Sequence, residues 1–531
     1  MLPHGARGVA WAPHQHVPAV LTPKDVDRRE PFARRPAIEL LLNARTVVLA
    51  ACYAASVALL FASRVREFAD ESDNLLGGLL LTRGYRLYVD YFSSHMPLAY
   101  YVAAAPALLG AERLEHFRVF SSVLLVLVTL GLAWAFRRRV SPAALGVWAT
   151  ITVFAHTVQW GEMLTAGTCA AFGIAAAGLL AFTTPRLRFD LRGMLCLSVS
   201  VAVAVQSELL SIFPLAVVAV AYVAARVRDA YSGSWHAAGR TLALMALVIA
   251  APHVLVVAGL WAVGALGEFV YDAYVFNQTY YAQFLMNPSI LGMLHDWEAQ
   301  YRTLVLSALA NPIGIEGCLI VANVLATVLI FRGRGPFVAV LYYLFIALTH
   351  VRNSGGYYVT SYFSLALLVV WAVDALRTRE RRLLAPAALV LALGATFAVQ
   401  VGRTYDLSGA PARSAPEVAI VQALTEPNER IFVAPYDPYI YLASGRAPAS
   451  TLPFYFPWQA LDPRSEGKLL DDLRTVRPPL VIFRRDELVN DRWLPRDYGT
   501  RVLELLERDY VPLDPSSAIL DDVFVRRDRR S

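Results

Sequence analysis

Long apolar runs separated by short connections constrain this chain of 531 residues more than any other feature. A helix needs roughly 20 apolar residues to cross the hydrocarbon core of a bilayer, with about 17 as a lower limit. Only 17% of the residues are charged and 57% are hydrophobic, whereas a soluble domain carries about a quarter charged residues. The sequence therefore predicts a polytopic α-helical membrane protein with about eleven transmembrane helices. We expect these helices at 46–63, 119–136, 142–158, 162–183, 193–207, 209–225, 241–266, 312–331, 336–350, 357–376 and 383–401.

The arginine clusters between these runs indicate which side of the membrane each connection faces. Cytoplasmic connections carry an excess of Arg and Lys. If the short segment 97–110 lies along the membrane interface instead of crossing it, five arginine-rich connections fall on the same side as the basic segment 1–44. We therefore expect a multi-pass protein of the plasma (inner) membrane with a cytoplasmic N-terminus. The five connections contain Arg137–Arg139, Arg186/Arg188/Arg192, Arg226/Arg228/Arg240, Arg332/Arg334 and Arg377/Arg379/Arg381/Arg382.

The same topology places three segments outside: a first loop at 65–118, a second loop at 267–302, and the tail after residue 401. In the tail, "ERIFVAPYDPYIYLASGR" and "PPLVIFRRD" have the composition of strands separated by turns, and "EGKLLDDLRTV" and "RVLELLERDY" that of amphipathic helices. We expect a membrane part over 45–401 and a small extracytoplasmic α/β domain over 402–531. The arginines do not lie on one basic face, so nucleic acid is not an expected partner.

The first loop opens with "FADESDNLLGG", which holds three carboxylates close to a predicted span. On a helix, Asp70, Asp73, Asn74 and Gly77 share one arc, and the opposite side is covered by Leu75, Leu76, Leu79 and Leu80. One interpretation is an interfacial helix with its apolar face in lipid or protein and its carboxylates aimed into a cavity. The other is that these acids simply occupy the first turn of a helix, where they are favoured.

Two more charged residues lie at the predicted outer level. Arg352 lies in "HVRNSGGYY", where the topology predicts few basic residues, and Glu162 lies at the outer end of a span in "HTVQWGEML". Arg352 is either an interfacial arginine with its head in water or a phosphate-binding cation, and Glu162 is either solvated or functional. A proton acceptor and a cation at one level are what group transfer from a lipid phosphate requires.

The stretch "FADESDNLLGGLLLTRGYRLYVDYFSSHMPLAYYVAAAPALLG" resembles the first-loop signature of the GT-C glycosyltransferases. The nearest branch contains the protein O-mannosyltransferases and the lipid A aminoarabinose transferases. The signature is an Asp-Glu pair, a Gly-x-x-x-Tyr-x-Asp element, and a His- or Lys-Pro-Pro-Leu box that opens an interfacial helix. Here it consists of Asp70-Glu71, then Gly84 with Tyr88 and Asp90, then His95-Met96-Pro97-Leu98, with Met96 in place of the first proline.

The resemblance, which covers about 45–401, implies roles for particular residues. Asp70 is implied as the base or acceptor-positioning residue, Glu162 as a second acid, and Arg352 as a contact to the lipid phosphate. The resulting assignment is as follows: catalytic, Asp70, Glu71 and Glu162; donor-phosphate-binding, Arg352, His95 and Arg118; substrate-binding, Asp73, Asp90, Tyr88, Tyr357 and Tyr358.

The resemblance also implies a donor and a reaction. The donor would be a polyprenyl-phosphate-linked sugar, a hexose or pentose, used with inversion, and the acceptor an envelope lipid, glycan or protein. No DxD metal motif is present in the first loop, although Asp70-x-x-Asp73 has a spacing that could hold a divalent cation. Two alternatives stay open: a transporter or lipid flippase of envelope precursors, and a non-catalytic assembly protein. Transporters tend to keep ionisable residues near the bilayer midplane, whereas the polar residues here gather at the outer ends.

Overall fold

The computed structural model describes residues 69–139, 163–231, 233–285, 290–310, 324, 327–328, 330–331, 335–350, 416–514 and 522–529. By its internal contacts the chain divides into Met1–Thr46 and Val47–Ser531, and all described residues belong to the second unit.

Within the described residues, four helical segments are long and apolar enough to cross a membrane: α4 (Leu114–Phe136), α6 (Ala166–Thr183), Leu209–Tyr231 with α8 (Ile212–Tyr231), and α9 (Trp235–Ala262). They coincide with four predicted spans. The predicted spans 193–207 and 336–350 also contain helices, α7 (Leu191–Ser207) and α14 (Pro336–Ala347). The predicted spans 46–63, 142–158, 357–376 and 383–401, and most of 312–331, lie outside the described residues.

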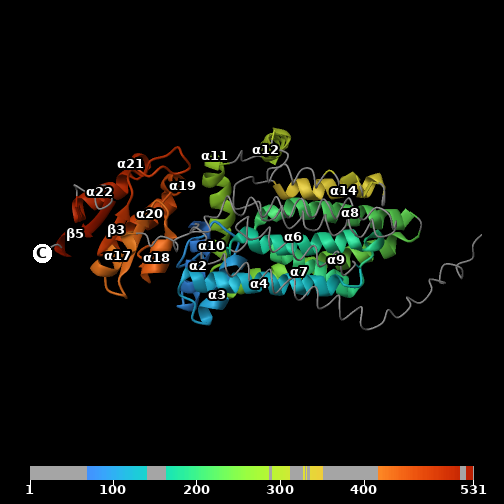
Figure 1. Ribbon diagram of the computed structural model, residues 1–531, viewed down its shortest axis with the longest axis horizontal. Helices are drawn as coiled ribbons and strands as arrows, with labels where there is room; N and C mark the ends of the chain where they lie inside the picture. Colours follow the sequence, from blue (N-terminus) through green and yellow to red (C-terminus); the bar gives the residue numbers. More distant parts are fainter. Residues whose placement is uncertain are drawn as a thin grey trace, which may run out of the picture. The chain divides into compact units, whose positions relative to one another are not determined.

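Helices α6, α7, α8, α9 and α14 lie side by side (Figure 1). The contact between α6 and α7 is close because Gly173 has no side chain: a Cβ there would lie 2.4 Å from the carbonyl oxygen of Ser200. Small residues at such contacts let helix backbones approach each other where no hydrophobic driving force exists.

The first loop contains two helices, α2 (Ala69–Thr82) and α3 (Leu98–Leu108), which pack against each other. α3 has 11 residues, or roughly 16 Å at the helical rise, so it is too short to cross a bilayer, as expected for 97–110. A Cβ on Gly77 would lie 2.4 Å from the Tyr100 ring, and one on Gly78 would lie 2.6 Å from the Ala103 Cβ. The Gly-Gly pair of the first-loop sequence is therefore what allows α3 to lie directly on α2.

The second predicted loop, 267–302, is helical where it is described. It contains α10 (Leu266–Val270), a π-helix η4 (Tyr271–Tyr281), α11 (Ala282–Leu285) and most of α12 (Ile290–Ala310). A π-helix of 11 residues is unusual, because π-helices occur mostly as single-turn bulges and often at functional sites.

The C-terminal region is an α/β structure around one sheet in the strand order β2-β1-β3-β5-β4. β1 pairs in parallel with β2 and β3, whereas β5 pairs antiparallel with β3 and β4. The strands are β1 (Arg430–Ala434), β2 (Ala447–Pro448), β3 (Leu480–Phe483), β4 (Tyr510–Pro512) and β5 (Val523–Arg526). The helices are α17 (Pro416–Leu424), α18 (Pro438–Ser444), α19 (Pro457–Leu461), α20 (Pro463–Val476), α21 (Pro495–Tyr498) and α22 (Thr500–Asp509).

Most of the secondary structure predicted for the tail is confirmed: β1, β3, α20 and α22 fall where expected. The stretch "PYIYLAS" is different, because it forms helix α18 and not a strand. Pro438 occupies its first turn, where proline is favoured, and Gly445 ends it with a positive φ of 74°. These helix-end signals outweigh the β propensity of the Tyr and Ile residues between them.

Candidate functional site

The three carboxylates at the start of α2 lie in three different environments. Asp70 is half-buried, whereas Glu71 and Asp73 are 0% and 3% exposed. The two acids Asp70 and Asp73 were expected on one polar arc aimed into a cavity. Of the two, only Asp70 is partly exposed, because α2 is buried on nearly all sides from Glu71 to Leu80. Its leucines pack against protein, some in a core that includes C-terminal residues such as Ile431.

Glu71 pairs with Arg118 near the start of α4 in an ion pair inside the protein. Arg118 Nη2 lies 2.7 Å from Glu71 Oε2, its Nε also bonds the carboxylate, and the two side chains are 2% and 0% exposed. The sequence assigns Glu71 to catalysis and Arg118 to the donor phosphate. In this geometry each neutralises the other, which is the arrangement that a buried charge requires, and together they fix α2 against α4.

Asp73 is held by two tyrosine hydroxyls. Tyr91 donates to Oδ1 and Tyr100 to Oδ2, both at 2.6 Å. Burial raises the pKa of Asp73 above its usual value, opposed by these two hydrogen bonds and by the nearby His95. Burial likewise raises the pKa of Tyr91 and of Tyr100 well above the usual range, so both hydroxyls stay protonated as donors. Asp73 thus anchors the first loop through two hydrogen bonds inside the protein.

The same hydrogen-bond network continues to the predicted His-Met-Pro-Leu box. Ser93 Oγ donates to the Tyr100 hydroxyl at 2.8 Å and accepts from the His95 amide at 3.0 Å, and Tyr88 donates to the His95 carbonyl at 2.9 Å. Tyr88 adopts a φ of 71°, which is unusual for a bulky residue, and its ring packs edge-on against Phe269 at 5.0 Å. The His95 side chain is half-buried beside Asp73.

Asp70 meets the C-terminal region. The hydroxyl of Tyr436, which follows β1, donates to Asp70 Oδ1 at 3.1 Å. Burial raises the pKa of Tyr436 well above its usual range, and the Asp70 carboxylate adds to this effect. Tyr436 therefore stays protonated and orients the Asp70 carboxylate by donating a hydrogen bond to it. The Asp70 side chain is only half-buried, so it stays partly accessible.

Of the remaining residues assigned from the sequence, Asp90 is not part of the cluster around Asp70, Glu71 and Asp73. Asp90 pairs with Arg86 at 3.0 Å, and this arginine lowers the pKa of Asp90. Asp90 lies past the opposite end of α2 from Asp70. Glu162, Arg352, Tyr357 and Tyr358 lie outside the described residues.

The three tyrosines that bond Asp70 and Asp73 were not predicted from the sequence: Tyr91, Tyr100 and Tyr436. Tyr91 and Tyr100 are in the quoted first-loop stretch. The sequence signal for Tyr100 is the Gly-Gly pair of α2, because the absence of a side chain at Gly77 leaves room for the Tyr100 ring. Tyr436 is 366 residues from Asp70 along the chain, and no local pattern predicts a contact over that separation. Among the described residues no group of three or more His, Cys, Asp or Glu side chains is placed to hold a metal ion.

Sequence reasoning also passed over Asp272, a buried carboxylate in the π-helix η4. It is 4% exposed, and among the described residues its Oδ2 accepts no hydrogen bond. Burial raises the pKa of Asp272 to about 8, with Glu268 adding to the effect and Arg464 and Lys468 opposing it. We interpret Asp272 as protonated in the folded protein at neutral pH.

We predict that Asp272 makes the protein less stable at alkaline pH. An aspartate in the unfolded chain has a pKa near about 4, so between that value and about 8 only the folded state retains the proton. The favourable contribution is complete below the lower value and is lost as the pH rises through the higher one. The fall in melting temperature from pH 5.5 to pH 9 should be smaller in Asp272→Asn than in wild type. Parallel pH profiles of the two proteins would contradict this.

Comparison with known proteins finds a similar fold among solved structures. No protein-family model matches the chain, and the search of curated proteins finds no match. The crystal structure of ArnT from Cupriavidus metallidurans bound to undecaprenyl phosphate is similar, with a TM-score of 0.51 and 13% sequence identity. The similarity covers 93% of this chain and 98% of that chain. At this identity the likeness is one of fold, and it extends over nearly the whole of both chains.

Proposed function

We propose that this protein is a GT-C-type membrane glycosyltransferase that moves a sugar from a polyprenyl-phosphate donor to an acceptor hydroxyl. The observation that carries the proposal is Asp70, the accessible carboxylate of the first-loop signature, held by Tyr436 while Glu71 and Asp73 are buried and paired. The fold likeness to ArnT, a protein crystallised with undecaprenyl phosphate, supports the donor class.

The reaction assigns one task to Asp70. The acceptor hydroxyl attacks the anomeric carbon of the sugar and passes its proton to the Asp70 carboxylate. The bond between the anomeric carbon and the phosphate oxygen breaks, and the polyprenyl phosphate leaves with the electron pair. Attack from the face opposite the leaving group inverts the anomeric centre. Glu162 remains the candidate second acid, and Tyr88 and the Asp73 network hold the loop on which the acceptor rests.

The phosphate that leaves needs a cation, and we propose Arg352 and His95 for this task, on the sequence assignment. Arg118 is not retained as a phosphate ligand, because its guanidinium is bonded to Glu71 inside the protein. Tyr357 and Tyr358 follow Arg352 closely in the sequence and are proposed to flank the sugar or the prenyl chain.

Replacing Arg352 by Ala should lower donor use at least about tenfold, because a charge-assisted hydrogen bond contributes about 1.5–3 kcal/mol. Steady-state kinetics with varied donor concentration measures the effect, and Arg138→Ala, at an exposed arginine just after α4, is the matched control. Unchanged KM and kcat for the donor in Arg352→Ala would make Arg352 an interfacial anchor only.

The reaction is proposed for the outer face of the bacterial plasma membrane, with the N-terminus inside and the C-terminal α/β region outside. We predict the labelling pattern of single cysteines in a background without the four native cysteines. Asp471→Cys, where the native side chain is 78% exposed, should react with a membrane-impermeant maleimide on intact spheroplasts, and Arg138→Cys only after lysis. Reaction of the Arg138→Cys protein before lysis would show that the proposed topology is wrong.

Mass spectrometry of envelope glycans and glycolipids from a deletion strain tests the function. A sugar absent from one envelope component, and restored by the wild-type gene, would name the product. A transporter or lipid flippase is distinguished by the side on which the precursor accumulates: its loss leaves the complete donor-linked precursor on the inner side, whereas loss of the transferase leaves it on the outer side. An envelope identical to wild type in every glycan would refute the transferase proposal.

A further inference from the structure

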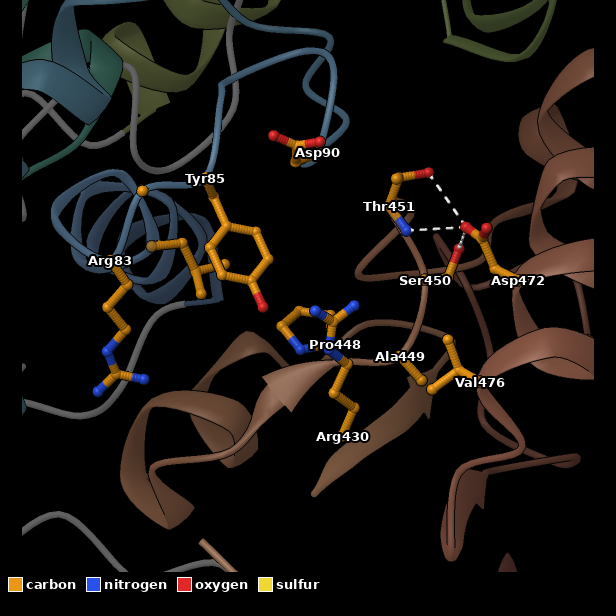
Figure 2. A pocket seen from close by; sticks show the side chains of 12 residues that line it. Arg83, Tyr85, Asp90, Arg430, Pro448, Ala449, Ser450, Thr451, Asp472 and Val476 are labelled. Carbon is orange, nitrogen blue, oxygen red and sulfur yellow. Dashed lines mark hydrogen bonds between the residues drawn. The ribbon is translucent and has the colours of Figure 1, made fainter. Parts of the chain in front are cut away.

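A polar pocket lies between the end of the first-loop helix α2 and the C-terminal sheet, apart from the Asp70 cluster. Its volume is about 310 Å³, and Figure 2 shows the side chains around it. One wall is Arg83, Tyr85 and Asp90, and the other includes Arg430, Thr451 and Asp472. We call this space the α2–β1 pocket.

Two direct contacts hold the walls of the α2–β1 pocket together. The Phe92 amide donates to the Thr451 carbonyl at 2.7 Å, and Lys468 Nζ donates to the Val89 carbonyl at 3.4 Å. Gly84, on the first wall, has a φ of 88°, and a Cβ there would meet no atom within 4 Å. The pocket is thus built by segments more than 300 residues apart in the chain and is open on the Gly84 side.

Two arginines give the α2–β1 pocket its cationic character. Arg83 and Arg430 are both exposed, and the Arg430 guanidinium carbon lies 5.6 Å from the centroid of the Tyr85 ring. The Tyr85 ring is half-buried and lies between the two arginines in the view of Figure 2. Guanidinium groups recognise carboxylate and phosphate in planar, bidentate geometry, and an aromatic face suits the apolar face of a sugar ring.

The opposite wall presents hydrogen-bond acceptors. Asp472 Oδ2 accepts from the Ser450 hydroxyl at 2.8 Å and from the Thr451 amide at 3.0 Å. Among the described residues no hydrogen bond ends on Asp472 Oδ1, so this oxygen is available to a ligand hydroxyl. The Asp90 carboxylate has both oxygens bonded to Arg86, which offsets its repulsion of an anion.

We propose that the α2–β1 pocket binds a saccharide that carries an anionic group, a carboxylate or a phosphate. Arg83 and Arg430 take the anionic group, Tyr85 contacts the ring, and Asp472 accepts from sugar hydroxyls. The proposal that the pocket binds a saccharide does not depend on the glycosyltransferase reaction. Only the role of the pocket as an acceptor subsite rests on the proposed glycosyltransferase function. Asp70 and Thr82 are at opposite ends of α2, about 18 Å apart at the helical rise, so an acceptor that reached both sites would be an extended glycan.

Binding of defined probes to the full-length protein in detergent tests the proposal. The probes are trigalacturonic acid, maltotriose as the neutral saccharide of matching size, glucose 6-phosphate, and inorganic phosphate. We expect trigalacturonic acid or glucose 6-phosphate to bind at least about tenfold more tightly than maltotriose. Arg430→Gln and Tyr85→Ala should each weaken that binding, Arg430→Gln by about tenfold or more. Arg474→Gln, at an exposed arginine on α20 paired with Asp471, should bind as wild type does.

Three results would overturn the inference: equal binding of maltotriose and the acidic probes, equal binding by wild type and Arg430→Gln, or inorganic phosphate binding as tightly as either acidic sugar. The Asp70→Asn variant separates this inference from the proposed function. It should bind the acidic probe as wild type does, and a loss there would mean that the two sites are one. If binding depends on Arg430 but no envelope glycan is missing in the deletion strain, the saccharide site stands and the transferase proposal fails.

Discussion

An Asp70→Asn protein is expected to lose sugar transfer by about 10²-fold or more while it stays folded and inserted in the membrane. Asparagine has nearly the same size, and its amide oxygen can still accept the hydrogen bond from Tyr436. What it lacks is a basic oxygen for the proton of the acceptor hydroxyl. The rate of transfer by purified protein and the restoration of the missing glycan in a deletion strain both measure the effect.

Glu115→Gln is the matched control, because Glu115 is an exposed carboxylate of the same predicted loop that takes no part in either proposed site. It should transfer at close to the wild-type rate. Asp73→Asn tests a different role: it removes the charge that Tyr91 and Tyr100 bond, so it should alter stability more than the chemical step. Wild-type transfer by Asp70→Asn would move the role of the base to Glu162.

The membrane-spanning helices could be predicted because their signal is local. A run of about 20 apolar residues has few alternatives to a transmembrane helix, and α4, α6, α8 and α9 coincide with predicted spans. The short helix α3 was also predictable, because 97–110 is short and the arginine clusters fall on one side only if this segment does not cross. Its place on α2 was not predicted, although the Gly77-Gly78 pair that makes it possible is visible in the sequence.

The environment of each acid could not be predicted, because it depends on what packs around α2. A helical projection places Asp70 and Asp73 on one face, but it cannot tell that α3 and the C-terminal region bury Asp73 and leave Asp70 half-exposed. The Asp70–Tyr436 bond joins two parts of the chain with unrelated local patterns. The π-helix around Asp272 was likewise not predicted, because 267–302 was expected only as an outer loop.

Breaking the ion pair between Glu71 and Arg118 should destabilise the protein more than any other single substitution considered. Arg118 is bonded to Glu71 at 2.7 Å with both side chains almost fully buried. Removing one partner takes away the counter-ion of a buried charge, which typically costs about 3–5 kcal/mol. Glu71→Gln and Arg118→Met should each shorten the half-life of monodisperse protein in heated detergent solution. Arg86→Gln, which breaks the exposed pair with Asp90, should have little effect.

The double variant Glu71→Leu/Arg118→Met then decides what the pair is for. Replacing both charges by apolar groups of similar size is often neutral for stability, so the double variant should recover most of the half-life that either single variant loses. If it also transfers sugar at close to the wild-type rate, the pair only fixes α2 against α4 and thereby sets the position of Asp70. A stable double variant without transfer would return Glu71 or Arg118 to the reaction itself. Single variants that are as stable as Arg86→Gln would show that the buried pair contributes nothing to the fold.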